Sequence, residues 1–261
     1  MNNTQKNAKE LIINARGQLI GNYGQAILVI LVVYFLSILL GSFVNLPSVP
    51  TFTSLLFMFL ILIIIDLLLG ILNFGKDRYF LNFARGVQGL SPADLFLNIK
   101  QNADKAIGIK LVYTLATALL EIPRVYIMFT VKMDALEFWT FASAYTLLSS
   151  LVIYVLQLFF GLSFYLLADR PDYSVLQILA ESNRLMRGNR LRFVAITLRL
   201  FPLMLLGSFA FFFGLLWPAA VYSTAVADFY LNLIGEEPFD PLSDKEPEPE
   251  PEPDPKSLLL K

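Results

Sequence analysis

The chain has 261 residues, of which 56% are hydrophobic and 16% are charged, and its formal net charge is −1. A soluble domain carries about 25% charged residues, so this composition excludes an ordinary soluble protein and indicates a polytopic membrane protein. The sequence has no Cys and no His, which excludes disulfides, thiol nucleophiles, imidazole bases and His metal sites. We therefore expect a protein that is not an enzyme, needs no cofactor, and has the lipid bilayer rather than nucleic acid as its partner.

Charge is divided unevenly along the chain. Residues 235–261 hold nine acidic and three basic residues, so the remainder is net positive. Residues 246–255 alternate acid and proline, a pattern that favours a solvated polyproline II segment and prevents a packed core. We interpret residues 1–234 as a membrane domain and residues 235–261 as an acidic, Pro-rich, disordered tail.

The N-terminal part of the chain predicts an amphipathic helix followed by two membrane spans. Residues 4–20 place apolar side chains on one helical face, and Gly21-Asn22 ends the helix. The apolar positions are Ala8, Leu11, Ile12, Ala15 and Leu19. Residues 25–44 and 51–73 are apolar segments of the length that a bilayer requires, and the second is interrupted only by Asp66.

The middle of the chain repeats this order. Ser91-Pro92-Ala93-Asp94 supplies an N-cap, a proline at the first helical position and an acid at the third, which predicts a helix over residues 91–102. Its inward side chains are Leu95, Phe96 and Ile99. Residues 106–120 and 141–167 are then the third and fourth predicted spans.

The third amphipathic helix is the best defined. It covers residues 174–187, begins with a capping box at Ser174, and ends at Gly188-Asn189. The apolar stretch 193–234 is too long for one crossing and suits two spans joined near residues 207–214. The sequence therefore predicts an all-α membrane protein with six transmembrane helices, whose three amphipathic helices bury their apolar faces in the membrane interface.

The first and third amphipathic helices align with an offset of 167 residues. Leu11 falls on Ile178, Leu19 on Met186, and Gly21-Asn22 on Gly188-Asn189. A weaker copy at an offset of 80 places Leu95 on Ala15 and Asn102 on Asn22. We interpret the chain as three tandem units, each an interfacial helix plus a transmembrane hairpin. The alternative is that any amphipathic helix before a span has this pattern.

The distribution of basic residues predicts the orientation. Of the 20 Lys and Arg residues, only Arg124 and Lys132 lie in the predicted outer connections. By the positive-inside rule, both termini are then cytoplasmic.

Several short runs within residues 8–233 stand out, namely Ala15-Arg16, Ala84-Arg85-Gly86, Ala168-Asp169, Gly188-Asn189 and Phe229-Tyr230. In these runs the chain resembles an uncharacterised bacterial membrane family, the domain of unknown function 975. One departure is Arg124, where the family usually has a glycine, and the outer loop beyond it is expanded. The resemblance implies a multi-pass cell-membrane protein and no catalytic residues to transfer.

Four ionisable residues fall inside the predicted spans at similar depth: Asp66, Lys110, Arg199 and Asp228. A lone charge at this depth costs roughly 2.5 to 3.5 kcal/mol, so two cations and two anions at one level predict an intramembrane polar layer. It is either a structural set of ion pairs or a polar pocket that binds or moves a solute.

Two functions fit this layer. The first is a non-enzymatic envelope protein that binds or regulates another membrane protein, or binds anionic lipid head groups through its basic interfacial helices. The second is a small transporter or channel-like subunit that uses the charged layer as its pathway. A cavity that is lined by residues 66, 110, 157 and 199 and reached by water would favour the pocket.

Overall fold

The computed structural model describes residues 6–42, 51–96, 99–131, 134–209 and 213–240, and within them the regular structure is helical throughout. In chain order the helices are α1 (Ala8–Leu19), α2 (Tyr23–Ser42), α3 (Phe52–Ala84), η1 (Pro92–Phe96), α4 (Ile99–Thr130), α5 (Ala135–Phe160), α6 (Ser163–Asp169), α7 (Val175–Met186), α8 (Arg190–Phe209) and α9 (Phe213–Ile234). The predicted all-α membrane fold is confirmed.

Five segments of the described chain are long and apolar enough to cross a membrane. They are Tyr23–Ser42, Leu56–Ala84, Asn102–Arg124, Ala135–Asp169 and Arg190–Phe209. The sixth predicted span forms α9, which is not among these five. Residues 223–232 of α9 are all buried, and α1, α2, α3 and α8 pack around it. α9 is therefore the central helix of the fold.

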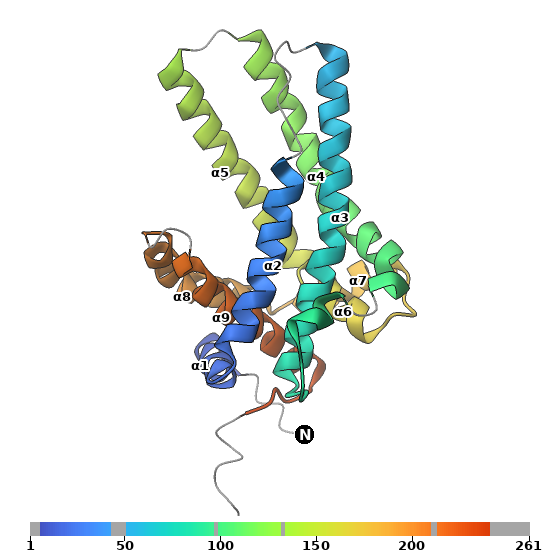
Figure 1. Ribbon diagram of the computed structural model, residues 1–261, viewed down its shortest axis with the longest axis vertical. Helices are drawn as coiled ribbons and strands as arrows, with labels where there is room; N and C mark the ends of the chain where they lie inside the picture. The colour runs from blue at the N-terminus through green and yellow to red at the C-terminus, as the bar shows by residue number, and fades with distance from the viewer. Residues whose placement is uncertain (1–5, 43–50, 97–98, 132–133, 210–212, 241–261) are drawn as a thin grey trace, which may run out of the picture.

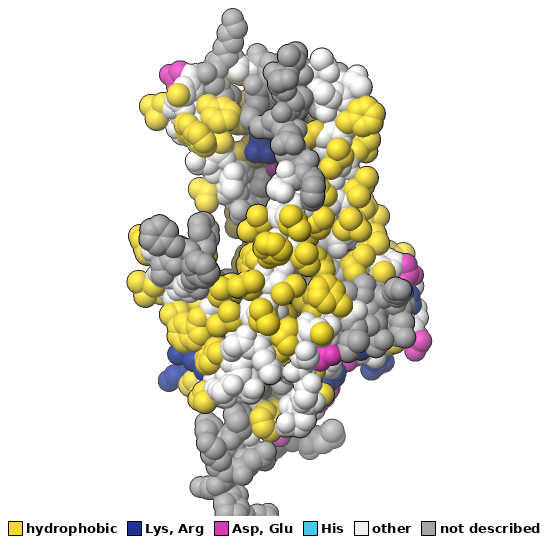
Figure 2. All heavy atoms as spheres, viewed as in Figure 1, with side chains coloured by type: hydrophobic (Ala, Val, Ile, Leu, Met, Phe, Trp, Pro, Cys, Tyr) yellow, Lys and Arg dark blue, Asp and Glu magenta, His cyan; other side chains and the backbone are white. Residues whose placement is uncertain are grey.

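The helices form an upright group on a wider base. In Figure 1, α2, α3, α4 and α5 rise from the base, whereas α8 and α9 lie side by side lower down and at an angle to them. α1, α6, α7 and residues 235–240 belong to the base. Hydrophobic side chains cover the middle of the face in Figure 2, and charged side chains gather mainly along its lower part. This distribution is the one expected of a bundle embedded in lipid.

The first and third units share their local geometry at the offset of 167 residues. α1 and α7 each have 12 residues and begin with a capping box, at Asn7 and Ser174 respectively. Each is followed by a glycine with positive φ, +85° at Gly21 and +86° at Gly188. This left-handed conformation suits glycine, and it turns the chain into a helix of 20 residues in both units.

The middle unit departs from the prediction. Residues 91–102 do not form one amphipathic helix, because η1 is a short 3₁₀-helix and α4 is non-helical at Asn102 (φ −135°, ψ 20°). Leu95 is buried as expected, but Phe96 is exposed. The cause is a close approach to α3, where a Cβ added to Gly75 would lie 2.2 Å from the Leu95 carbonyl oxygen. The chain there is held against α3 by its backbone.

The apolar faces of α1 and α7 also differ from the prediction, since they are buried in protein rather than in the membrane interface. Leu11 and Leu19 are fully buried where α1 packs against α8 and α9. Ile178 and Met186 are fully buried where α7 packs against α5 and α6. A helical period identifies an apolar face, but it does not tell whether lipid or protein covers that face.

The core lies at the base, where α3, α6 and α9 each contribute a run of aromatic and leucine side chains. All these side chains are at most 3% exposed: Tyr79, Phe80, Leu81, Tyr165, Leu166, Leu167, Phe229, Tyr230 and Leu231. The rings of Tyr165 and Tyr230 stack with centroids 5.6 Å apart. Burying large apolar side chains stabilises the fold by about 1.5 to 3 kcal/mol each, so this cluster holds the three units together.

Candidate functional site

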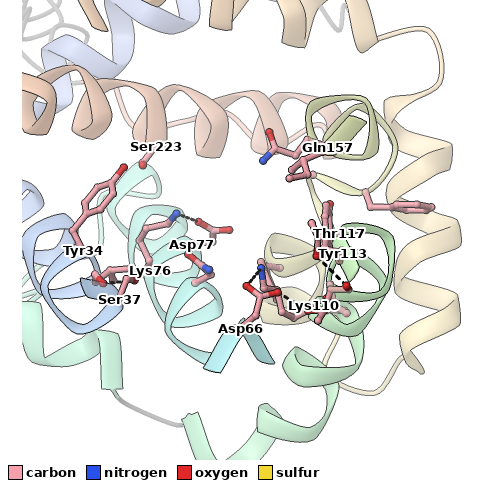
Figure 3. Close-up of a pocket in the computed structure, with 18 of the residues that line it drawn as sticks. Tyr34, Ser37, Asp66, Lys76, Asp77, Lys110, Tyr113, Thr117, Gln157 and Ser223 are labelled. Carbon is pink, nitrogen blue, oxygen red and sulfur yellow. Dashed lines mark hydrogen bonds and ion pairs between the residues drawn. The ribbon is translucent and has the colours of Figure 1, made fainter. Parts of the chain in front are cut away.

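A cavity of about 910 Å³ lies among α2, α3, α4, α5, α8 and α9. Its wall is mostly apolar, but charged and amide side chains project into it from α3, α4 and α5. Figure 3 shows Gln157 of α5 pointing toward the space that Asp77 of α3 and Lys110 of α4 also face. Polar groups from separate helices thus converge inside an apolar bundle.

The middle of the cavity holds an ion pair between α3 and α4. Lys110 Nζ lies 2.9 Å from Asp66 Oδ1, and the Thr114 hydroxyl donates to Asp66 Oδ2 at 2.6 Å. The helices come close here because α3 has a glycine at position 70, whose added Cβ would lie 2.5 Å from Lys110 Cβ. Lys110 keeps only 19% of its side chain exposed.

Two further acid and base pairs line the same cavity. Lys76 Nζ lies 3.3 Å from Asp77 Oδ1 on α3. Arg124 Nε donates to Glu121 Oε2 at 2.6 Å on α4. Three acids and three bases give the cavity no net formal charge.

These pairs are spread along the bundle. Asp77 follows Asp66 by 11 residues on α3, and Glu121 follows Lys110 by 11 residues on α4, so each interval is about 16 Å at 1.5 Å per residue. Figure 1 shows α3 and α4 running in opposite directions. The intervals therefore add to about 33 Å, close to the ~30 Å hydrocarbon thickness of a bilayer.

Some polar groups of the cavity have no partner. Asn73, Tyr113 and Gln157 line the wall, and their side chains make no hydrogen bond to any residue in the described ranges. Each amide offers two donors and an acceptor. These groups are available to water or to a ligand.

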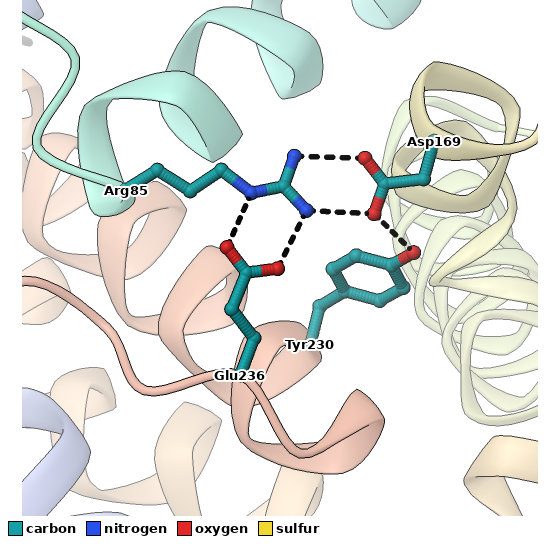
Figure 4. Close-up of polar contacts among 4 residues, drawn as sticks. All are labelled: Arg85, Asp169, Tyr230 and Glu236. Atoms are coloured by element: carbon teal, nitrogen blue, oxygen red, sulfur yellow. Dashed lines mark hydrogen bonds and ion pairs between the residues drawn. The ribbon is translucent and has the colours of Figure 1, made fainter.

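A second polar cluster lies at the base, outside the cavity (Figure 4). The Arg85 guanidinium donates to both oxygens of Asp169 at 2.8 and 2.9 Å, and to both oxygens of Glu236 at 2.8 Å. The Tyr230 hydroxyl donates to Asp169 Oδ2 at 2.8 Å. Hydrogen bonds to Glu236 and then to Asp169 raise the pKa of Arg85 above its ordinary value, so this cation is always charged.

Comparison with known proteins identifies the family. The profile described as "Protein of unknown function (DUF975)" matches residues 1–237. The chain belongs to the DUF975 family. No curated protein and no solved structure matches it. The resemblance inferred from the sequence is confirmed, and the matched region of this DUF975 protein includes both the cavity and the Arg85 cluster.

The DUF975 fold brings only two of the four predicted layer residues together. Asp66 and Lys110 form the central pair. Asp228 lies elsewhere, fully buried in α9, where it accepts from Asn14 Nδ2 at 3.0 Å and from Gln18 Nε2 at 3.1 Å. Arg199 is exposed on α8 and makes no ion pair with any residue of the described chain. Residues 66, 110 and 157 line the cavity, whereas residue 199 is not among its lining residues.

The sequence analysis missed the Arg85 cluster as a site. Arg85, Asp169 and Tyr230 each lie in one of the runs that carry the resemblance to DUF975, so a signal was present. Charges outside the spans had not been considered as partners, because nothing in their spacing relates positions 85, 169 and 236.

Proposed function

We propose that this protein is a non-enzymatic membrane protein that binds a small ligand within the bundle and thereby assists or regulates another envelope protein. The observation that supports this proposal is the cavity of about 910 Å³ with unpaired polar groups. Small-molecule pockets typically have about 300 to 1,000 Å³ and a few convergent polar groups in an apolar wall. This cavity has both properties.

The polar groups of the cavity favour an occupied or hydrated site. The side chains of Asn73 and Gln157 are half-buried and lack a partner among the described residues. A polar group that loses its water without gaining a partner costs about 1 to 3 kcal/mol. Water or a ligand that bonds to both amides removes this cost.

The ionised groups of the cavity favour binding over catalysis. Asp66, Asp77 and Glu121 each lie within ion-pair distance of a cation, so none of the described carboxylates in the cavity wall is left as a free general base. The sequence also lacks His and Cys. Both features support a protein without enzymatic activity.

We further propose that the protein resides in the cell membrane with its base and both termini in the cytoplasm. The 20 Lys and Arg residues, of which only Arg124 and Lys132 are assigned to the outer side, support this orientation. A fluorescent reporter fused after Lys261 should then be bright, and an alkaline phosphatase fusion at the same site should be inactive. An active phosphatase fusion contradicts the orientation.

The natural absence of Cys makes the cavity testable with single introduced thiols. Ser37→Cys and Thr117→Cys place a thiol in the cavity wall, whereas Ser150→Cys places one on the exposed side of α5. A membrane-impermeant thiol reagent should label the first two in membranes and leave the third unlabelled. Equal resistance of all three thiols contradicts a ligand-accessible cavity.

A second candidate function is transport of a solute through the bundle. The observation that favours it is the series of ion pairs that extends over about 33 Å of helix rise. In that case Thr117→Cys should react with reagent added outside, and Ser223→Cys, also in the cavity wall, with reagent added inside. Labelling from one side only favours the binding protein over the transporter.

A further inference from the structure

The side chains of α3 that line the cavity change from apolar to polar along the helix. Phe59 and Leu62 face it with apolar side chains, whereas Asp66, Asn73 and Asp77 face it with polar ones. Residues at intervals of three and four lie on one face of a helix, so these five form a single stripe. Next to its polar middle the cavity therefore has an apolar zone along Phe59 and Leu62, and this zone ends where Glu121 and Arg124 of α4 line the wall.

The facing helix α5 also places an apolar side chain next to a polar one in the cavity wall. It runs opposite to α4, so Ile153 lies nearer the outer end and Gln157 nearer the base, and both line the cavity. A ligand that fits both walls has an apolar part and a polar part. An amphiphile has this form.

The polar end of the cavity has no net charge. Asp66 is neutralised by Lys110, and Asp77 by Lys76. An ionic head group would bring an uncompensated charge into a low-dielectric site, which is strongly unfavourable. The free amides of Asn73 and Gln157 instead offer donors and acceptors in equal measure.

We propose that the cavity binds a single-chain amphiphile whose head group is zwitterionic or uncharged. The head group lies between Asn73, Gln157 and the Asp66 and Lys110 pair, and the chain lies along Phe59 and Leu62. A single chain suits a volume of about 910 Å³, which is within the range of small-molecule pockets. The proposal rests on the proposed function, because it names the ligand of the same cavity.

The surrounding bilayer is the source of this ligand. Leu62 and Tyr34 line the cavity and are also 41% and 58% exposed. These two residues of α2 and α3 mark the part of the wall where we place a lateral opening toward the lipid. An amphiphile reaches the polar groups by lateral entry with its chain in the hydrocarbon.

The test is binding of tritiated lysophosphatidylcholine to the full-length protein in lipid nanodiscs, by scintillation proximity. Unlabelled lysophosphatidylglycerol and an alkyltrimethylammonium of the same chain length serve as anionic and cationic competitors. The zwitterion should bind at least about tenfold more tightly than either, equivalent to ~1.4 kcal/mol. Equal affinities, or a preference for a charged competitor, contradict the proposal that the head group is zwitterionic or uncharged. The proposal that the cavity binds a ligand would still stand.

The site is tested by a matched pair of variants. Gln157→Leu removes an amide from the cavity and should weaken binding of the zwitterion by about tenfold. Gln25→Leu makes the same change at an exposed position of α2, outside the cavity wall, and should leave binding unchanged. If both variants bind like the wild type, the amphiphile lies outside this cavity and the inference fails. If none of the probes binds and the cavity thiols also stay unlabelled, the proposed function fails with it.

Discussion

The Arg85 guanidinium and the Asp169 carboxylate face each other with two hydrogen bonds, at 2.8 and 2.9 Å, and so join the end of α3 to the end of α6. The same guanidinium holds Glu236, just after α9. These three helix ends fall in the three tandem units that we interpreted from the sequence. One side chain therefore ties together segments that lie 84 and 151 residues apart in the sequence.

Loss of the Arg85 hydrogen bonds should destabilise the fold. Arg85→Ala leaves two partly buried carboxylates without a cation and should lower the free energy of unfolding by about 3 kcal/mol. Arg85→Lys keeps the charge but loses the planar fork, so it should recover only part of this loss. Chemical denaturation of the detergent-purified protein measures both. The control is Arg184→Ala, which breaks an exposed pair with Glu181 and should change nothing measurable.

Burial of the amphipathic faces in protein gives a second prediction. Ile178→Asp places a carboxylate at a position of α7 that is fully buried, and should unfold the base even in detergent. Leu176→Asp, on the same helix but 78% exposed, should leave the thermal midpoint in detergent almost unchanged. If the two variants differ only in a bilayer, lipid rather than protein covers this face of α7.

The central ion pair gives a third prediction. Asp66→Ala and Lys110→Ala should each lower the free energy of unfolding by about 2.5 to 3.5 kcal/mol, because each leaves one charge at depth in the membrane. The double variant should lose clearly less than the sum, since the two residues lie 2.9 Å apart.

Arg199 provides the control for this pair. Because Arg199 is exposed and has no ion pair among the described residues, the losses from Asp66→Ala and Arg199→Ala should add within about 0.5 kcal/mol. A strong coupling between positions 66 and 199 would show that the layer predicted from the sequence forms after all.

The sequence predicted the bounds of the helices better than it predicted which residues of different helices lie in contact. Length, hydropathy and end signals such as Ser174 and Gly188 are local, and they placed α1, α2, α7 and α8 within a few residues of their observed bounds. The depth of Asp66 and Lys110 in the membrane also follows from their positions along their own predicted spans, and the two residues do form an ion pair. The direction in which a helix points each side chain depends on tertiary packing and not on the local sequence. In this fold that direction places Arg199 and Asp228 away from Asp66 and Lys110.

The middle amphipathic segment, residues 91–102, shows the same limit. Its cap at Ser91 was visible in the sequence, and the Ser91 backbone N–H does donate to Asp94 Oδ2 at 2.7 Å. Its short 3₁₀ form depends on a contact with Gly75, 20 residues away from Leu95. Nothing in the pattern of residues 91–102 indicates that contact.

Close approach at another glycine gives the last prediction. A Cβ added to Gly70 would lie 2.5 Å from Lys110 Cβ and 2.7 Å from its Cγ, so Gly70→Ala must push α3 away from α4. The change should lower the free energy of unfolding by about 1 to 3 kcal/mol and weaken the Asp66 and Lys110 pair that lines the cavity. Gly41→Ala is the control, because its Cβ meets no heavy atom within 4 Å, and in a helix it should be neutral or stabilising by up to about 1 kcal/mol. Denaturant unfolding measures both, and a Gly70→Ala protein as stable as Gly41→Ala contradicts the close packing of α3 on α4.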